Sequence, residues 1–178
     1  MKNEIIPNIG NYKNLLTYQK AVIIYDITYY FCKNYLEKKD QTVDQMIQAA
    51  RSGKQNIVEG CSAAPTSAKT EIKLINVAKA SFKELLEDYE DYLRVRGLKQ
   101  WAEGSIENTA MRRLGRECYD TAFYMSKVRR SPPETIANMV IVLLKQEDYL
   151  LFKQLKWLEE DFIKNGGFSE RMSKGRRR

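Results

Sequence analysis

Residues 45–60 read QMIQAARSGKQNIVEG, and this stretch decides the fold class. Apolar residues recur here at three- and four-residue steps, so they fall on one side of a helix while charged and amide side chains face elsewhere. With the flanking positions included, the apolar face comprises Val43, Met46, Ile47, Ala50, Ile57, Val58 and Cys61. The pattern predicts an amphipathic helix that packs against other helices.

Local signals mark the ends of this helix. Thr42, with Gln45 three residues later, forms a capping-box pattern, and Gly60 is expected to end the helix. Gly53 falls inside it, where glycine costs about 1 kcal/mol relative to alanine. We therefore interpret Gly53 as a point of close approach by another helix.

Three more long helices are predicted. The first spans Asn14 to about Glu37, the next begins near Ser67 and ends at Gly97, and the last begins at the capping-box pattern Ser131-Pro-Pro-Glu134 and ends before Gly166-Gly167. The apolar and aromatic surface expected for the first comprises Leu15, Tyr18, Val22, Tyr25, Ile27, Tyr29 and Cys32. Long helices joined by short connections pack as antiparallel bundles.

Residues 98–130 give a weaker helical pattern. One apolar stripe runs through Ile106, Ala110, Leu114, Cys118, Ala122 and Met125, and it is weakened by Gly104 and Gly115. We predict an all-α fold, an antiparallel up-down four-helix bundle over residues 1–165, with an inserted, partly helical segment at about 98–130 before the last helix. A basic, disordered tail is expected over residues 166–178.

Residue types argue against an enzyme. Histidine is absent, which removes the Ser-His-Asp triad, the Cys-His dyad and every histidine-containing metal site. Cys32, Cys61 and Cys118 lack the paired spacing of a zinc or redox motif, so we expect buried, reduced thiols. We expect no catalytic residue, no cofactor and no metal.

An acidic cluster on the third predicted helix is the one constellation that suggests a metal. It comprises Glu84, Glu87, Asp88, Glu90 and Asp91, but the di-iron pattern of helical bundles requires Glu-x-x-His pairs. We interpret it as a solvated face, or as an interface to basic side chains of a neighbouring subunit. For Asn56 and Glu59, hydrogen bonds at a helix corner are favoured over a ligand role.

Charge points to a polyanionic partner. The net charge is +7, and residues 105–133 and 166–178 carry most of it, at +3 and +4. The candidate RNA-binding residues are Arg51, Lys54, Arg112, Arg113, Arg116, Arg129, Arg130, Arg176, Arg177 and Arg178. The alternative is that these cations only solvate the surface.

Neither a membrane span nor a signal peptide is predicted. Apolar runs such as Ala21–Ile24 and Val140–Leu144 meet a charge long before they reach membrane-spanning length, and the N-terminal MKNEIIPNIG has no hydrophobic core. We expect a cytoplasmic protein. The tyrosines crowded into residues 12–35 suit core and subunit-interface packing better than stacking on bases.

Over Leu15–Leu93 the chain resembles a known family of helical bundles. The matching residues are Gln19, Lys20 and Ala21 in the first helix, Gln45, Ala49, Ala50, Ser52, Asn56, Ile57, Glu59 and Gly60 in the second, and Ser67, Lys69, Glu71, Ala78, Ser81 and Glu84 in the third. They resemble the four-helix-bundle proteins encoded in intervening sequences of ribosomal RNA genes. They also resemble the accessory variability determinants of diversity-generating retroelements, in particular the members whose names carry a four-helix-bundle suffix.

The resemblance implies a non-catalytic, RNA-associated homo-oligomer. By resemblance the oligomer would be a pentamer, with structured RNA or an RNA-protein complex as partner, and with a reverse transcriptase as a further partner in the retroelement branch. Gly53, Asn56, Glu59 and Gly60 would form its structural motif. The alternative from another class is an oligomeric protein-interaction scaffold that binds no nucleic acid. Salt-sensitive RNA binding separates the two.

Overall fold

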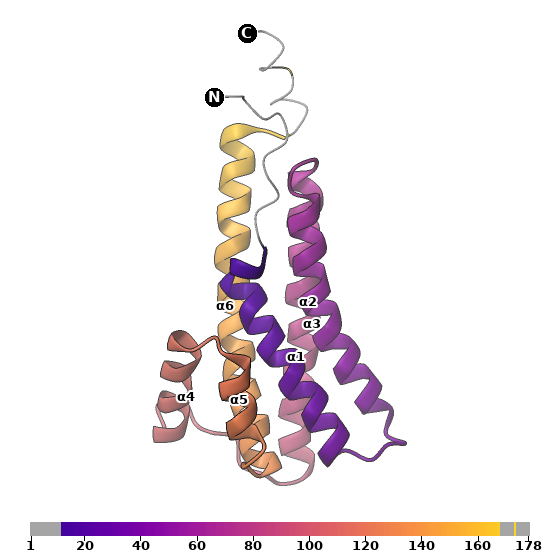
Figure 1. Cartoon of the computed structure of the whole chain (residues 1–178), viewed down its shortest axis with the longest axis vertical. Coiled ribbons are helices and arrows are strands. Elements are labelled where there is room, and N and C mark those ends of the chain that lie inside the picture. Colours follow the sequence, from indigo (N-terminus) through magenta and orange to yellow (C-terminus); the bar gives the residue numbers. More distant parts are fainter. Residues whose placement is uncertain (1–11, 168–172, 174–178) are drawn as a thin grey trace.

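The computed structural model describes residues 12–167 and 173, and its main feature is a set of long helices packed side by side (Figure 1). Between residues 12 and 167 the chain forms a 3-10 turn, η1 (Tyr12–Asn14), and the helices α1 (Leu16–Tyr35), α2 (Gln41–Ala63), α3 (Ala68–Val95), α4 (Ile106–Glu117), α5 (Thr121–Val128) and α6 (Pro133–Asn165). The predicted all-α class is confirmed. Apart from residues 166, 167 and 173, the predicted tail lies outside the described residues.

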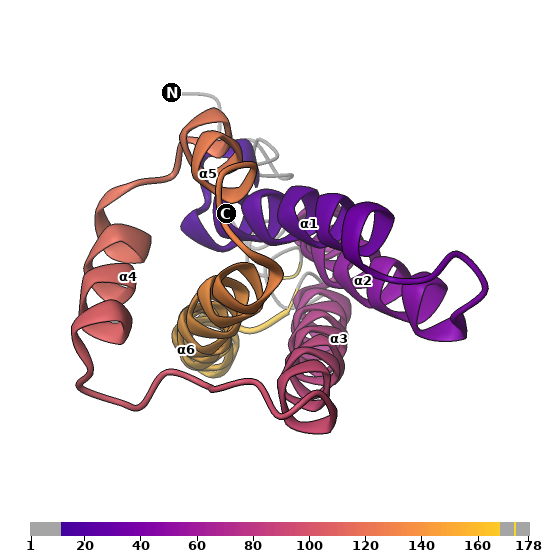
Figure 2. The ribbon, with the colours of Figure 1, turned by 90° about the horizontal axis from the view of Figure 1, so that it is seen from below.

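The four long helices, α1, α2, α3 and α6, are each packed against two of the others. Helix α1 contacts α2 and α6, and α3 contacts α2 and α6 on the other side. Figure 1 shows that successive members of this set run in opposite directions. Helices α4 and α5 lie outside the set, where α4 packs on α6 and α5 packs on α1 (Figure 2).

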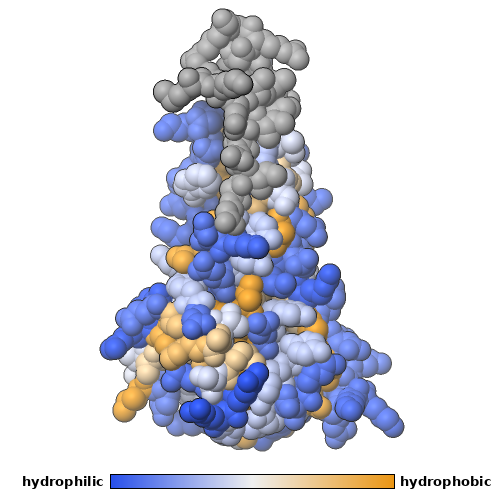
Figure 3. Space-filling model, viewed as in Figure 1, coloured by the Kyte–Doolittle hydropathy of each residue, from blue (hydrophilic) through white to orange (hydrophobic). Residues whose placement is uncertain are grey.

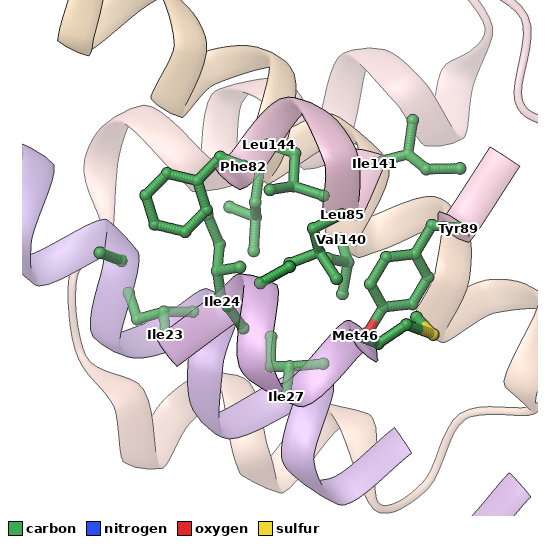
Figure 4. Close-up of a cluster of buried hydrophobic side chains, with 14 of the residues drawn as sticks. Ile23, Ile24, Ile27, Met46, Phe82, Leu85, Tyr89, Val140, Ile141 and Leu144 are labelled. Carbon is green, nitrogen blue, oxygen red and sulfur yellow. The ribbon is translucent and has the colours of Figure 1, made fainter. Parts of the chain in front are cut away.

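The four long helices share one apolar core (Figure 4). Ile24 and Ile27 of α1 meet Met46 of α2, Leu85 of α3 and Val140 of α6, and all five are at most 1% exposed. Burying each such side chain contributes about 1.5–3 kcal/mol. The phenol of Tyr89 is also buried, and its hydroxyl donates to Oγ1 of Thr28 at 3.1 Å, so α1 and α3 are joined by a polar contact within the core.

The buried face of α1 matches the predicted one only in part, since Ile27 and Cys32 are buried as expected. Tyr18, Val22 and Tyr25 are only partly buried and Tyr29 is 48% exposed, whereas Ala21, Ile23, Ile24 and Phe31 are fully buried. Helix α1 contacts α2, α6 and α5 on different sides, so it is buried over a wide arc. Because apolar residues surround the helix, periodicity gave no reliable face.

Both predicted ends of α2 are wrong. Asp40 is the N-cap, since its carboxylate accepts from the backbone N–H of Thr42 at 2.9 Å, and the helix begins at Gln41. Gly60 does not end the helix, which continues to Ala63. A Cβ at Gly60 would lie 3.3 Å from Cδ1 of Ile75, so this glycine serves the packing of α2 on α3.

The ends of α3 match the sequence signals well. Ser67 caps its start by accepting from the backbone N–H of Thr70 at 3.1 Å. After Val95, Gly97 adopts φ +63°, and Leu98 N–H donates to the carbonyl of Leu93 at 2.9 Å, which is the Schellman arrangement. The glycine therefore ends α3 as predicted.

The predicted capping box at the start of α6 is absent. Pro132 is the N-cap, and Ser131 Oγ donates backwards to the carbonyl of Lys127 at 3.0 Å. The Glu134 carboxylate accepts from the backbone N–H of Lys99 at 3.0 Å, so it anchors the segment after α3. At the other end, Gly166 adopts φ +72° directly after Asn165, as expected.

Residues 98–130 contain two helices whose buried faces were not predicted. Ile106, Ala110 and Ala122 of the expected stripe are exposed, Ile106 by 86%, and the stripe is broken because α4 ends at Glu117. The side chains that are buried instead belong to Asn108 and Met111 in α4 and to Tyr124 and Val128 in α5. Asp120 caps α5 by accepting from Ala122 N–H at 2.9 Å.

The three cysteines are free thiols that differ in burial. Cys32 and Cys61 are buried free thiols, and Cys118 is free but half-buried. Burial raises the pKa of Cys32 to about 12 and that of Cys61 to about 11, so both are protonated at neutral pH.

Among the helices of the described residues, none is both long enough and apolar enough to cross a membrane.

Gly53 lies at a tight contact between α2 and α3. A Cβ there would be 2.5 Å from Cζ of Phe82, whose ring is 2% exposed and enclosed by the core. We expect Gly53→Ala to lower the free energy of unfolding by about 1–3 kcal/mol through overpacking. Chemical denaturation measures this. In a Phe82→Leu background, Gly53→Ala should lower the free energy of unfolding by clearly less. An equal loss in both backgrounds would contradict the proposed clash.

Candidate functional site

A cavity of about 530 Å³ lies between α4 and α6. Its walls are supplied mainly by these two helices, with the buried side chain of Lys20 from α1 also in the lining. The lining residues are Lys20, Glu103, Asn108, Arg112, Gly115, Arg116, Tyr119, Val142, Lys145, Gln146, Tyr149 and Leu150. The volume falls within the range of small-molecule sites, about 300–1,000 Å³.

Gly115 and Gln146 set the distance between α4 and α6. The Gln146 amide donates to the carbonyl of Arg112 at 2.7 Å, and a Cβ at Gly115 would overlap the Gln146 amide oxygen. A side chain at position 115 would therefore displace the Gln146 amide from its contacts with Arg112 and Lys20. The sequence pattern predicts that Gly115 weakens the helix, whereas Gly115 lies inside α4 and is buried.

Lys20 provides a buried ammonium beside the cavity. Its side chain is 1% exposed, and Nζ donates to the carbonyl of Gly115 at 2.5 Å and to Oε1 of Gln146 at 3.2 Å. Nζ also lies 4.9 Å from the centre of the Tyr119 ring, a cation-π contact. Burial lowers the pKa of the lysine to about 8, partly offset by the charge of Glu147. Both hydrogen-bond partners of Nζ are acceptors and the Tyr119 ring lies beside it, so the ammonium form is favoured even while Glu147 is neutral.

Glu147 is the acidic counterpart of this lysine, but no direct ion pair joins them. The Glu147 side chain is fully buried, and neither of its carboxylate oxygens has a hydrogen-bond partner. Burial raises the pKa of Glu147 well above its ordinary value, while the charge of Lys20 opposes that shift. The protonated, neutral carboxyl is thus strongly favoured over a buried charge without hydrogen bonds.

Asn108 adds a second unsatisfied group, this one in the lining of the cavity. The residue is 8% exposed, and its amide oxygen Oδ1 is buried without a hydrogen-bond partner. Ser105, the N-cap of α4, accepts from the Asn108 backbone N–H at 3.2 Å and so fixes the first turn of the helix. A buried acceptor without a donor costs about 1–3 kcal/mol.

The remaining charges of the lining are mainly positive. Arg112 and Arg116 lie one helical turn apart on α4, Lys145 faces them from α6, and Glu103 is the one acid in the lining. Lys145 has a distant ion-pair partner, since its Nζ lies 3.8 Å from the carboxylate of Glu90. With Lys20 charged, positive charge exceeds negative charge around the cavity, so the site favours an anion.

The structure separates the candidate RNA-binding residues into groups. Arg112 and Arg116 line the cavity, and exposed Arg113 lies 3.5 Å from Glu117. Arg129 and Arg130 follow α5 and are exposed. Arg51 and Lys54 belong to α2, which lies away from α4 (Figure 2), and Nζ of Lys54 sits over the Tyr25 ring. Arg176, Arg177 and Arg178 lie outside the described residues.

The proposed corner bonds of the α2 motif are not formed as expected. The Asn56 amide donates back within α2, to the Ser52 carbonyl at 2.8 Å and to its hydroxyl at 3.1 Å. Ser52 in turn lies 3.0 Å from the Ser81 hydroxyl of α3. The Ser52–Ser81 contact joins α2 and α3 near the middle of both helices and not at the corner, and Glu59 is exposed.

The acidic cluster on α3 is partly paired within the chain. The Glu90 carboxylate accepts from Gln100 at 2.9 Å, and Asp91 pairs with Arg94 at 2.7 Å. Burial raises the pKa of Asp88 to about 6, with smaller effects from the charges of Glu84 and Asp91. In the described part of the chain, no three histidine, cysteine or acidic residues are grouped so as to hold a metal ion.

Sequence reasoning missed Lys20, Glu147, Asn108 and Tyr119 as members of a site. A signal existed for Glu147, because it occupies a core position in the i, i+4 stripe that continues to Leu151 and Leu155. Lys20 likewise precedes the apolar run from Ala21 to Ile24. No signal in the sequence indicated that α4 would cover these residues, because the packing of α4 depends on tertiary contacts.

Comparison with protein-family models, with curated proteins and with solved structures finds no match for this chain. The site is therefore interpreted from its own residues alone.

Glu147 makes the stability depend on pH. The folded chain keeps this proton at pH values where the unfolded chain has lost it, so the free energy of unfolding falls as the pH rises above the ordinary carboxyl pKa of 4.5. Glu147→Gln should remove this pH dependence. Relative to the wild type, the free energy of unfolding of the variant should rise by up to about 1.4 kcal/mol per pH unit between about pH 5 and about pH 7.

Denaturation curves over this pH range provide the test. Glu160→Gln, which removes an exposed carboxyl of the same helix, is the matched control. Parallel pH profiles for the wild type and Glu147→Gln would contradict a protonated carboxyl in the core.

Proposed function

We propose that this protein is a non-catalytic, oligomeric helical protein that binds structured RNA or an RNA-protein complex through the segment formed by α4 and α5. The architecture we propose is an antiparallel up-down four-helix bundle of α1, α2, α3 and α6, with α4 and α5 as its insertion. Its compartment would be the cytoplasm. The retroelement accessory proteins and the intervening-sequence proteins remain the closest roles by resemblance.

One observation carries the RNA assignment, namely that basic side chains are exposed throughout α4, α5 and the residues that follow. Arg112, Arg113, Arg116, Arg129 and Arg130 are all exposed, on a segment that stands outside the four long helices (Figure 2). A phosphate backbone neutralised by such cations releases counterions, which favours binding at low salt. A protruding segment also presents these cations to a large partner without disturbing the core.

An aromatic and apolar surface accompanies these cations. Figure 3 shows orange side chains over the region of α4 and α5 among mostly hydrophilic neighbours. Phe123 of α5 is 38% exposed, and Nζ of Lys127 lies 4.9 Å from the centre of its ring. An exposed ring beside a cation is suited to stacking on an unpaired base. The combination supports RNA as partner more than a surface of scattered lysines would.

The outer part of α6 supports self-association. Tyr149, Phe152, Trp157 and Ile163 fall on one side of the helix, and they are between 53% and 84% exposed. Aromatic residues with this exposure are enriched at protein interfaces. We propose that copies of this chain bury the stripe against one another, with five subunits by resemblance. The same stripe favours the alternative function, a protein-interaction scaffold without nucleic acid.

RNA binding through α4 and α5 is testable without altering the cavity. We expect the triple change Arg113→Gln, Arg129→Gln and Arg130→Gln to weaken binding of a structured RNA. The slope of log affinity against log salt should flatten by roughly 0.9 for each phosphate that the variant no longer neutralises. Filter binding or fluorescence anisotropy over a salt series measures both quantities.

A control variant of equal charge removes the effect of net charge. Lys69, Lys73 and Lys83 are exposed lysines of α3, and changing all three to Gln lowers the net charge by the same amount. If both triple variants weaken RNA binding equally, the binding is non-specific. If neither variant changes the affinity, α4 and α5 are not the RNA surface.

The assembly state provides a separate prediction. Light scattering of nuclease-treated protein should give the mass of an oligomer, and Trp157→Glu should shift it towards the monomer because a charge cannot be buried cheaply at an apolar contact. Lys73→Glu, at an exposed position of α3 away from this stripe, is the control. A monomeric wild type would contradict self-association, and an oligomer indifferent to RNA would favour the protein scaffold.

A further inference from the structure

We propose that the cavity between α4 and α6 is a binding site for a nucleoside monophosphate. This inference does not depend on RNA binding by the surface of α4 and α5. It rests on three features of the lining, which are a surplus of positive charge, a buried acceptor without a donor, and aromatic walls.

The charge of the lining selects an anion with more than one negative charge. Arg112 and Arg116 come from one helix and Lys145 from the other, with Glu103 as the single opposing acid. Lys20 adds a fourth cation, which is almost completely buried and therefore weakly screened by solvent. A phosphate monoester carries about −1.5 to −2 charges at neutral pH and matches this surplus better than a single carboxylate does.

Lys20 supplies a fixed positive charge for such an anion. An ammonium group has three N–H donors. Two acceptors are in place, the Gly115 carbonyl at 2.5 Å and the Gln146 amide oxygen at 3.2 Å. The Tyr119 ring lies beside the ammonium, at 4.9 Å from Nζ, and the side chain is 1% exposed, so Lys20 acts on an anion in the cavity mainly through its charge. Because the ammonium is held by α4 and α6 at once, it is already fixed in position before a ligand binds.

Asn108 specifies the other end of the ligand. Its buried Oδ1 lacks a donor, so a ligand that brings an N–H or O–H group would satisfy it. Asn108 lies two turns of α4 before Gly115, whose carbonyl holds Lys20, and two turns correspond to about 10.5 Å along the helix. A single inorganic phosphate is too small to contact both ends. The amino groups of a nucleobase and the hydroxyl groups of a ribose are donors of the required kind.

The apolar part of the lining suits a planar body. Tyr119 and Tyr149 contribute rings, and Val142 and Leu150 contribute aliphatic surface. Base-aromatic stacking is worth about 1–3 kcal/mol for each base. Tyr149 is 60% exposed, whereas Tyr119 contacts the buried ammonium of Lys20, so aromatic surface extends from the solvent to the polar centre of the site.

Isothermal titration calorimetry at low salt tests the site with the full chain. The probes are the four common ribonucleoside 5′-monophosphates, with inorganic phosphate and the unphosphorylated nucleosides as their parts. We expect at least one monophosphate to bind about tenfold more tightly than either of its parts, a difference of about 1.4 kcal/mol. Equal affinity for inorganic phosphate would overturn the nucleoside assignment, and the absence of binding by every probe would overturn the site.

Two variants and one control assign the binding to this cavity. Lys145→Gln and Asn108→Leu should each lower the affinity for the monophosphate about tenfold, which corresponds to about 1.4 kcal/mol. Lys153→Gln is the control, because Lys153 is an exposed lysine of the same helix that does not line the cavity. An equal weakening in Lys153→Gln would show that only the surface charge is sensed and would overturn the proposal.

Asn108→Leu carries an internal check on folding. Because the change removes an unsatisfied buried oxygen, the ligand-free variant should melt no lower than the wild type while it binds more weakly. Should the variant unfold, Lys145→Gln at the solvent-facing rim still decides the matter. The RNA-binding triple variant should keep its affinity for the monophosphate, so the two proposals fail independently.

Competition distinguishes the two sources of this ligand. A monophosphate that displaces bound RNA would place a nucleotide of that RNA in the cavity, and one that leaves RNA bound would identify the ligand as a free nucleotide. Either result supports the site, provided that Lys145→Gln lowers the affinity for the monophosphate.

Discussion

The buried ammonium of Lys20 is the constraint on which the inserted segment depends. An ammonium without hydrogen-bond partners is costly in an apolar core, and its two acceptors come from α4 and α6. Helix α4 must therefore lie where the Gly115 carbonyl reaches Nζ. The absence of a side chain at Gly115 leaves room for the Gln146 amide, which is the second acceptor of Nζ. A single side chain of α1 thus positions a segment about a hundred residues later.

The unsatisfied groups around this lysine give the core a local weakness beside a well-packed interior. Glu147 has no hydrogen-bond partner for its carboxyl oxygens, and Asn108 has none for its amide oxygen, whereas the core formed by residues such as Ile24 and Leu85 is apolar and closed. Natural chains retain such costs where a site needs them, since strain and unsatisfied groups collect at functional positions. The cavity lies where these costs are concentrated, and it is where we place a ligand.

Helix existence and helix ends differ in how far sequence predicts them. Ser67 and Gly97 bound α3 because a side-chain cap and a left-handed residue act within one turn of the chain. Ser131 failed as a cap because Glu134 bonds instead to Lys99, thirty-five residues away. Gly60 failed as an end because it serves the contact with Ile75. Local chemistry is predictable where no distant partner competes for the same group.

By itself the sequence determined that this chain is helical and where its four long helices lie. It also determined that the positive charge gathers around α4 and α5 and in residues 166–178. Periodicity, helix breakers and charge can all be read locally along the chain. Only the tertiary structure decided that Arg112 and Arg116 share a cavity with Lys20, that Arg51 lies elsewhere, and that Glu147 is buried without a partner. These facts depend on how distant helices meet, and that is decided by the packing of surfaces that no single stretch of sequence encodes.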